Sequence, residues 1–181
     1  MKKLMIVAAG IFFASSVAFA QKTVEVGGAP MYPTKNIIEN AVNSKDHTTL
    51  VAAVKAAGLV ETLQGAGPFT VFAPTNAAFA KLPAGTVDNL LKPENKAMLT
   101  TVLTYHVLSG RFSSADIAKA IKAGNGNAEF KTVQGGVLTA MMSGKDVVLK
   151  DAKGGTSKIT IMDVNQSNGV IHVVETVVMP K

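Results

Sequence analysis

Hydrophobic and polar residues recur with two different periods along this chain, and the change falls near Gly126. Before that point, apolar residues lie three and four positions apart, a spacing typical of short amphipathic helices that pack one face on a core. After it, short apolar runs alternate with polar turns, which is typical of β-strands. The pattern therefore predicts helices in the first half and strands in the second.

The first half contains six predicted helices and one short strand. The longest helix follows Pro93, and one of its faces collects Leu99, Val102, Leu103, His106 and Val107. The other helices are expected from 36 onward, over 50–58, over 76–82, over 87–91 and over 113–122, with the strand over 69–73. Residues 21–35 lack periodicity and contain the pair Gly27-Gly28, so we expect an extended lead-in there.

The second half contains five β-prone runs separated by glycine-rich turns. They cover 128–133, 137–142, 146–151, 157–164 and 170–179. Such spacing is typical of antiparallel meanders and sandwiches. The last run is apolar on both faces, which predicts a central strand. Together the two halves predict an α+β fold, one domain over 36–181, with helices packed on one side of an antiparallel sheet.

The first twenty residues have the features of an export signal. Lys2 and Lys3 precede an apolar run, and Ala18-Phe19-Ala20 supplies the small-x-small pattern of a cleavage site. A retained membrane anchor is the alternative, but this run is shorter than the roughly 20 residues that a spanning helix needs. We therefore expect a signal peptide at 1–20 and a secreted protein, extracellular or periplasmic, with no stable membrane insertion after cleavage.

Composition narrows the functional classes further. The chain has no cysteine, which excludes thiol nucleophiles, disulfides and cysteine-ligated metal sites. Its net charge is +6, yet the basic residues are spread out, and it has no tryptophan and only two tyrosines. Nucleic-acid binders concentrate basic residues on one face and add aromatic residues that stack on bases. We therefore expect no nucleic-acid partner.

The sequence contains few of the features that a catalytic site needs. The three histidines, His47, His106 and His172, are not at metal-ligand spacing, and no phosphate-binding, dinucleotide or nucleophile-elbow motif occurs. We expect His47 at a helix start, capping or on the surface, and His106 and His172 as buried, hydrogen-bonded residues. The sequence predicts no enzyme, no metal site and no cofactor.

Three segments resemble the signature segments of the fasciclin domain family, and they occur in the family's order. They are Thr70-Val71-Phe72-Ala73-Pro74-Thr75-Asn76-Ala77-Ala78-Phe79, the pair Tyr105-His106, and the stretch from Asn168 to Pro180. Residue chemistry accounts for part of this pattern. Thr75 and Asn76 suit a turn and a helix cap, and Phe79 a core contact. Asn168 and Gly169 suit a tight turn with positive φ, leading into a strand that contains His172.

The resemblance implies a fold and a class of function. The fold is a wedge or β-sandwich with helices on one side. Members are extracellular or surface modules of cell adhesion and matrix interaction, generally without enzymatic activity, and single-domain bacterial members are associated with adhesion, biofilm or host contact. The expected partner is a cell-surface or matrix protein or a polysaccharide.

The resemblance also names candidate binding residues and a second function. In some animal relatives the Tyr-His neighbourhood and an Asp-Ile pair near the closing segment are linked to integrin binding. Tyr105 and His106 match the first, and Asp163 and Val164 occupy the second with valine in place of isoleucine. Some fasciclin-like proteins bind carotenoids, so a carrier for a small apolar ligand is the alternative.

Overall fold

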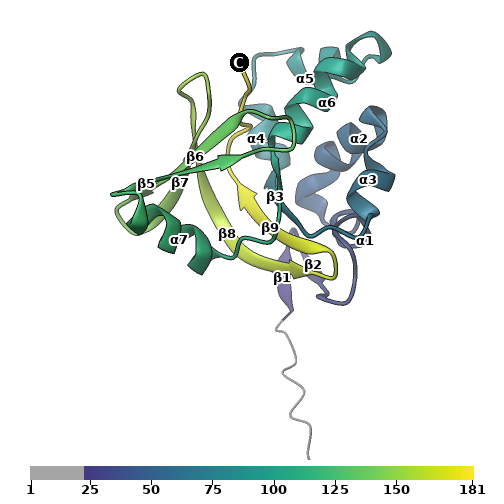
Figure 1. Ribbon diagram of the computed structural model, residues 1–181. Coiled ribbons are helices and arrows are strands. Elements are labelled where there is room, and N and C mark those ends of the chain that lie inside the picture. Colours follow the sequence, from purple (N-terminus) through teal and green to yellow (C-terminus); the bar gives the residue numbers. More distant parts are fainter. Residues whose placement is uncertain (1–22) are drawn as a thin grey trace, which may run out of the picture.

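The computed structural model describes residues 23–181 of the chain (Figure 1). The predicted signal peptide at 1–20 lies outside these residues. Within them, no helix combines the length and the apolar character that crossing a bilayer requires.

Seven strands form one strongly curled sheet, in the order β4-β3-β9-β8-β7-β6-β5 (Figure 1). Their bounds are β3 Phe69–Pro74, β4 Val107–Ser109, β5 Asn127–Lys131, β6 Val137–Ser143, β7 Asp146–Lys150, β8 Thr156–Gln166 and β9 Gly169–Val174. A β-bridge between Leu108 and Thr132 brings the two edge strands together, so the sheet is nearly closed into a barrel. The α+β class is confirmed.

The sheet departs from the prediction at one pair, because β3 and β9 run parallel while the other neighbouring strands are antiparallel. The chain between these two strands contains helices and the whole meander, and such a long connection allows parallel pairing. β9 is buried at every position between β3 and β8. The prediction that the last strand is central is therefore confirmed.

Six helices, α1 to α6, precede the meander, and one helix, α7, leads into it. Their bounds are α1 Ile37–Ala41, α2 Thr48–Ala57, α3 Val60–Gln64, α4 Asn76–Ala80, α5 Thr86–Leu90, α6 Lys96–Tyr105 and α7 Ser114–Ala123, with 3-10 turns at Lys45–His47 and Pro93–Asn95. The helices α1, α2, α3 and α6 lie together on one side of β3 and β9, whereas α7 packs against β5 and β6 (Figure 1). The N-terminal helices thus share one side as expected, and α7 lies apart from them.

The alternation of side chains along β3 and β9 separates two cores. One face of these strands packs against the helices and forms the helix-side core, which includes Ile38, Leu50, Val71, Leu103, Val164 and Ile171. The other face points into the curled sheet and forms the inner core, which includes Phe72, Tyr105, Ile117, Leu138, Leu149 and Val174. Adjacent residues on one strand therefore serve different cores, as the period of two requires.

The lead-in is packed rather than simply extended. Val24–Val26 and Ala29–Met31 form strands β1 and β2 of a small hairpin, and its turn uses the positive φ of Gly27 and Gly28. Val26, Ala29 and Met31 are buried in the helix-side core. The described part of 21–35 therefore contributes to the core.

Candidate functional site

Tyr105 fixes a surface turn from inside the molecule. Its side chain is fully buried in the inner core. The hydroxyl donates to the Val137 carbonyl at 2.6 Å and accepts from the Ala152 N–H at 3.1 Å. Because the hydroxyl donates to one backbone group and accepts from another, its hydrogen bonds stabilise the fold.

His106 lies one residue further on and faces the other core. The helix that was predicted to continue through Val107 ends at Tyr105, and Val107 begins β4. The Nδ1–H group of His106 donates to the Val102 carbonyl at 2.8 Å, and Nε2 accepts from the Val178 N–H at 3.1 Å. This pattern requires a neutral ring, and burial lowers its pKa to about 4. His106 thereby ties the C-terminal segment to α6, and the expected buried, hydrogen-bonded histidine is found.

Asp163 binds the first residue of α7, whose own cap is Ser113, and Val164 is buried. Asp163 has a φ of 57° within an irregular part of β8. Its carboxylate accepts from the Ser114 N–H at 2.7 Å and from the Ser114 hydroxyl. That position at the start of α7 also favours a negative charge. Val164 is buried in the helix-side core, so this pair presents little surface to a partner.

His172 completes a second hydrogen-bonded group, separate from that of His106. Its Nδ1 accepts from the Asp163 N–H at 3.3 Å, and its Nε2–H donates to the Phe112 carbonyl at 2.8 Å. Burial lowers the pKa of His172, which keeps the ring neutral. The ring thereby connects β9 with the bulge of β8 and with the segment before α7.

The first signature segment also acts through caps, with one correction. Thr75, rather than Asn76, caps α4, because its hydroxyl accepts from the Ala78 N–H at 3.2 Å. The Asn76 side chain instead reaches α2, where it accepts from the Thr49 N–H at 3.0 Å. Phe79 is buried in the helix-side core as predicted.

Asn168 and Gly169 hold the closing hairpin in a way that the sequence did not predict. The expected positive φ occurs at neither residue. Asn168 instead accepts from the Ile37 N–H at 3.0 Å and donates to the Leu63 carbonyl at 2.8 Å. Gly169 is required for space, because a Cβ there would collide with the carbonyl oxygen of Phe69 on the paired strand.

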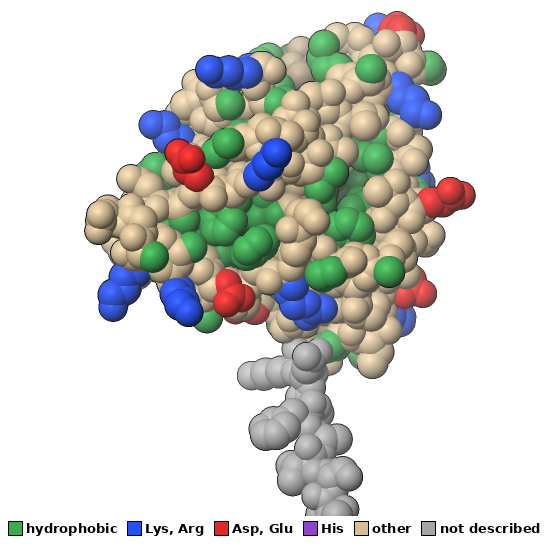
Figure 2. All heavy atoms as spheres, in the orientation of Figure 1, with side chains coloured by type: hydrophobic (Ala, Val, Ile, Leu, Met, Phe, Trp, Pro, Cys, Tyr) green, Lys and Arg blue, Asp and Glu red, His purple; other side chains and the backbone are tan. Residues whose placement is uncertain are grey.

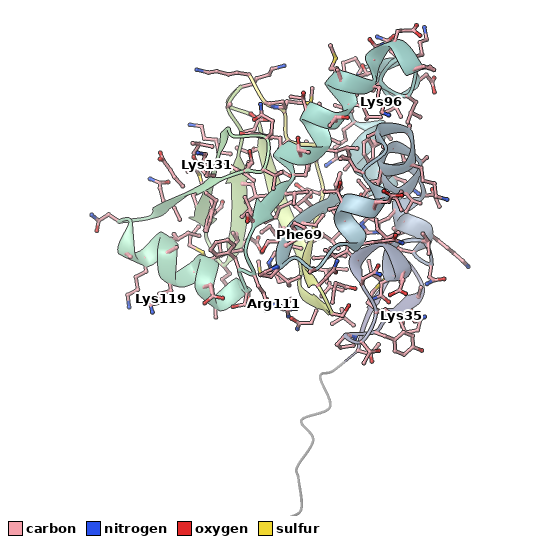
Figure 3. The ribbon with its side chains drawn as sticks, turned by 45° about the vertical axis from the view of Figure 1, so that its right-hand side comes forward. Lys35, Phe69, Lys96, Arg111, Lys119 and Lys131 are labelled. Atoms are coloured by element: carbon pink, nitrogen blue, oxygen red, sulfur yellow. The ribbon has the colours of Figure 1, made fainter. Side chains whose placement is uncertain are left out.

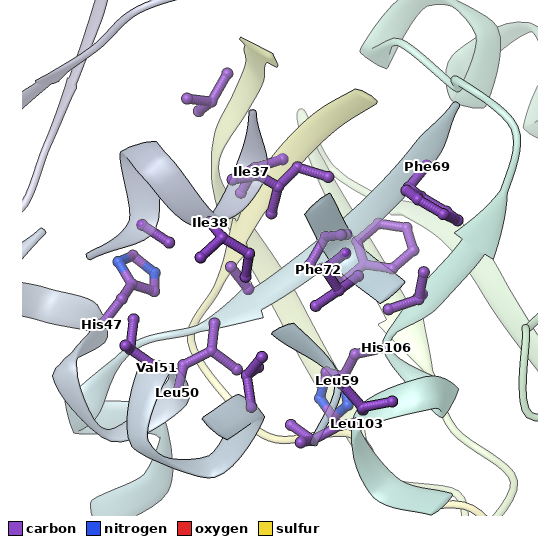
Figure 4. A pocket seen from close by; sticks show the side chains of 18 of the residues that line it. Ile37, Ile38, His47, Leu50, Val51, Leu59, Phe69, Phe72, Leu103 and His106 are labelled. Carbon is purple, nitrogen blue, oxygen red and sulfur yellow. The ribbon is translucent and has the colours of Figure 1, made fainter. Parts of the chain in front are cut away.

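A cavity lies between the helices and the sheet within the helix-side core (Figure 4). It has a volume of about 70 Å³, and almost all its walls are apolar, including Ile37, Ile38, Leu50, Val54, Leu59 and Leu103. Val133, which is 46% exposed, and the exposed Thr62 are also among its lining residues, so part of the lining reaches the surface. Such a cavity suits an apolar guest.

His47 borders this cavity, which corrects its predicted position. It was expected as a cap or surface residue, yet it is only 3% exposed and its side chain makes no capping bond. A polar residue before a helix gives the same sequence signal whether it turns outward or inward. The sequence alone therefore could not predict that the His47 side chain packs against the cavity.

The exposed surface offers an apolar turn and scattered cations. Val133 and Val137, at the two ends of the turn between β5 and β6, are 46% and 45% exposed. Apolar side chains gather in the middle of the face shown in Figure 2, with most lysines and arginines toward its margin. In Figure 3, Lys96, Lys119 and Lys131 project in different directions around Phe69. On this face the basic residues therefore form no continuous track.

Among residues 23–181, no group of three or more His, Cys, Asp or Glu side chains is arranged to hold a metal ion. The histidines at 106 and 172 have both ring nitrogens occupied by structural partners. The arrangement is that of a scaffold, with its polar side chains joining backbone segments.

Comparisons with known proteins agree with this description. A model of the fasciclin domain matches residues 45–180. The protein sll1483 of Synechocystis is 44% identical over 162 residues, which cover 88% of this chain and 82% of that protein. The cell surface glycolipoprotein MPB83 of Mycobacterium bovis is 36% identical, over 77% of this chain and 58% of its own length. A solved FAS1 domain pair from the insect cell adhesion molecule fasciclin I has a similar fold, with a TM-score of 0.70 at 15% identity, covering 80% of this chain and 51% of the pair.

Proposed function

Because this chain belongs to the fasciclin domain family, whose members are associated with cell adhesion and the cell surface, we propose that it is a non-enzymatic interaction module outside the cytoplasm. The predicted signal peptide at 1–20 supplies the route of export, to the periplasm or the extracellular space. The expected partner is a surface or matrix protein or a polysaccharide. One observation carries the proposal: the signature residues are committed to internal bonds and hold an exposed apolar turn in place.

Three hydrogen bonds fix the turn that begins after β5 and ends at Val137. The Val133 N–H donates to the Val107 carbonyl at 2.8 Å, and the Gln134 N–H donates to the Thr104 carbonyl at 3.3 Å. Tyr105 binds the Val137 carbonyl from below. A loop fixed in this way loses little conformational entropy when a partner binds. The two half-exposed valines therefore supply a preorganised apolar contact.

Tyr105 and His106 take part in this function as positioning residues. Tyr105 orients the turn by binding the Val137 carbonyl. His106 stabilises the C-terminal end of α6, and the Thr104 carbonyl there accepts from the Gln134 N–H of the turn. This assignment differs from direct contact with a partner, because both side chains are buried. The same reasoning makes Asp163 a support for α7.

The test replaces Val133 and Val137 together with serine. Their exposed halves would contribute about 1 kcal/mol each on burial, so binding should weaken at least tenfold. Biolayer interferometry would measure the binding of the purified protein to surface polysaccharide and to surface proteins from the producing organism. Val42, which is 49% exposed near α1, provides the matched control as Val42→Ser. Equal binding by the double variant and the control would remove this turn from the interface. A lack of binding to every surface component would contradict the proposal itself.

A second candidate function is that of a carrier for a small apolar ligand, and the cavity between helices and sheet favours it. A cavity of 150 Å³ in another protein holds benzene, whereas this one measures about 70 Å³. A carotenoid would lie largely outside it unless the helices moved apart. The structure therefore supports a smaller guest, and a colourless preparation from a pigment-producing host is the expected result.

A further inference from the structure

The outer face of strands β5 to β8 brings together lysines that are far apart in the sequence. Lys131 lies on β5, Lys150 on β7 and Lys158 on β8. The residues that precede Lys131 and Lys150 and the one that follows Lys158 are buried in the inner core: Phe130, Leu149 and Ile159. Because successive side chains on a strand point to opposite faces, the three lysines share the outer face of the sheet.

Protection of the sheet edge accounts for only one of these lysines. Lysines on edge strands discourage unwanted strand pairing, and β5 is an edge strand. Lys150 and Lys158, however, lie on strands that have neighbours on both sides. Lys158 binds Asp146 at 2.7 Å, so its charge is countered within the sheet. Lys131 and Lys150 form no salt bridge with any residue among 23–181, and both are exposed, so their charges can act on a partner.

A hollow of about 580 Å³ opens beside these two lysines. Its lining comes from β6, from the turns at either end of the meander and from the C-terminus, and includes Gln134, Val137, Thr139, Ala152 and Lys181. In the strand pairing Lys131 lies opposite Val137, and Lys150 lies opposite Thr139. Lys153 directly follows Ala152 and is also exposed. Three lysines therefore surround a hollow whose size is in the range of small-ligand sites.

Two carboxylates near the hollow do not cancel these three charges. Glu129 lies on β5, opposite Thr139. Asp151 contributes to the lining but is only 9% exposed. Its carboxylate accepts from three backbone N–H groups, those of Lys153, Gly155 and Met179. Asp151 therefore stabilises the turn between β7 and β8, and the exposed charge around the hollow is mainly positive.

The polar groups of the hollow indicate the chemistry of the ligand. The Gln134 Oε1 atom accepts from the Gly136 N–H at 2.9 Å, which leaves the NH₂ group of this amide as a donor. Thr139 adds a hydroxyl, which both donates and accepts. A chain that carries carboxylates and hydroxyls matches the lysines and both of these groups. An acidic peptide offers carboxylates with fewer hydroxyls, and a nucleic acid would lack exposed aromatic rings for its bases, since Tyr105 is buried.

We propose that this hollow binds an acidic polysaccharide, with Lys131, Lys150 and Lys153 facing its carboxylates and Thr139 and the Gln134 amide facing its hydroxyls. This inference rests on the interaction function proposed above and names the class of partner. Val137 belongs both to the fixed apolar turn and to the lining of the hollow. The turn and the lysines therefore form one continuous contact surface.

The experiment titrates the purified protein with an alginate oligosaccharide, a polymer of uronic acids, and with a neutral dextran oligosaccharide of the same length. Binding is followed by the backbone amide resonances in two-dimensional NMR spectra. Alginate should shift the resonances of residues 134–139 and 150–156 most strongly, whereas dextran should bind much more weakly. The affinity for alginate should fall as salt is added, because exposed charges are screened.

A triple variant removes the charges around the hollow: Lys131→Ala, Lys150→Ala and Lys153→Ala. Its affinity for alginate should be about tenfold lower, since exposed ion pairs contribute a few-fold each. The matched control removes three exposed lysines elsewhere, on α2, after α5 and on α7: Lys55→Ala, Lys92→Ala and Lys119→Ala. It has the same net charge and should bind alginate like the wild type. Thr139→Val, which keeps the shape of the side chain, should bind a few-fold more weakly because one hydrogen bond is lost.

The outcomes separate this inference from the function on which it rests. A loss of alginate binding confined to the first triple variant supports the site. An equal loss in both triple variants would show attraction by net charge alone and overturn it. Tighter binding of polyglutamate than of alginate would identify an acidic protein as the partner and also overturn it. If alginate does not bind while a surface protein binds in the interferometry experiment, this inference fails and the interaction function stands.

Discussion

His106 connects α6 to the C-terminal segment, and lowering the pH should weaken that connection. Nε2 accepts a hydrogen bond from Val178, so a proton can bind there only when that bond breaks and a charge enters the core. Burial accordingly lowers the pKa of His106 from 6.5 to about 4. The unfolded chain takes up this proton near pH 6.5 and the folded protein only near pH 4. Between about pH 6.5 and pH 4 the unfolded state therefore binds more protons than the folded state, and the free energy of unfolding falls as the pH decreases through this range.

The size of the effect follows from the shift in pKa. A difference of about 2.5 units corresponds to about 3 kcal/mol, at 1.36 kcal/mol per unit. This contribution is fully present above pH 6.5, is reduced by about 2 kcal/mol at pH 5, and is lost below about pH 4. His47 and His172 also have lowered pKa values and act in the same direction. A comparison with a variant is therefore needed to isolate His106.

The assay is urea unfolding of the wild type and of His106→Leu at pH 7.5 and pH 5. Far-UV circular dichroism is the suitable signal, because the chain has no tryptophan. At pH 7.5 the variant should be about 1–3 kcal/mol less stable, since the Val102 carbonyl and the Val178 N–H lose their partner. At pH 5 the gap should narrow by about 2 kcal/mol, because only the wild type loses the contribution of this histidine. A gap that stays constant between the two pH values would refute the reasoning.

Two further substitutions test the supports around the sheet. Asp163→Ala removes the acceptor of the Ser114 N–H and hydroxyl at the start of α7, where Ser113 and Asp116 still form the helix cap. It should lower the free energy of unfolding by about 1–2 kcal/mol in the same urea titration. Asp163→Asn, which keeps an acceptor, should cost less, and an equal loss in both variants would contradict this role of Asp163. Gly169→Ala places a Cβ against the Phe69 carbonyl and should cost more than about 3 kcal/mol or prevent folding. Gly144→Ala, at a turn with open space and a φ of +63°, should cost only the roughly 1–2 kcal/mol of an alanine in the left-handed region. A mild Gly169→Ala variant would show that β3 and β9 separate easily.

The meander was the most predictable part of the fold, because local information specifies it. Turns such as Gly135-Gly136 interrupt runs of suitable length, and hairpins pair neighbours in sequence. The parallel pairing of β3 with β9 could not be predicted in this way. It brings Phe69 beside Gly169, a hundred residues away, and depends on the fit of both cores. The short elements α3 and β4 were missed for a related reason, since five and three residues are too few to show a period.

The candidate site shows the same limit. Residue type was enough to predict that His106 and His172 would be buried and hydrogen-bonded. It gave no means of seeing that Asn76 would cap α2, or that His47 would turn inward beside Ser44. A side chain can reach several backbone groups near a helix start, and which of them it contacts depends on elements distant in sequence. The sequence therefore indicated which polar residues form hydrogen bonds more often than it indicated the partners of those bonds.

The positions of the signature residues constrain where any partner can bind. Asn168, Tyr105 and His106 use polar side-chain atoms to bind backbone groups of other segments, and Thr75 uses its hydroxyl to cap α4. Contact by a partner with these atoms would first break bonds that hold the fold, at a cost of about 1–3 kcal/mol for each group left unpaired. Residues that determine the partner must therefore lie where side chains are free, such as Val133 and the neighbouring turn. Two proteins of this family can share the same internal bonds and still bind different partners, because the scaffold and the contact surface use different residues.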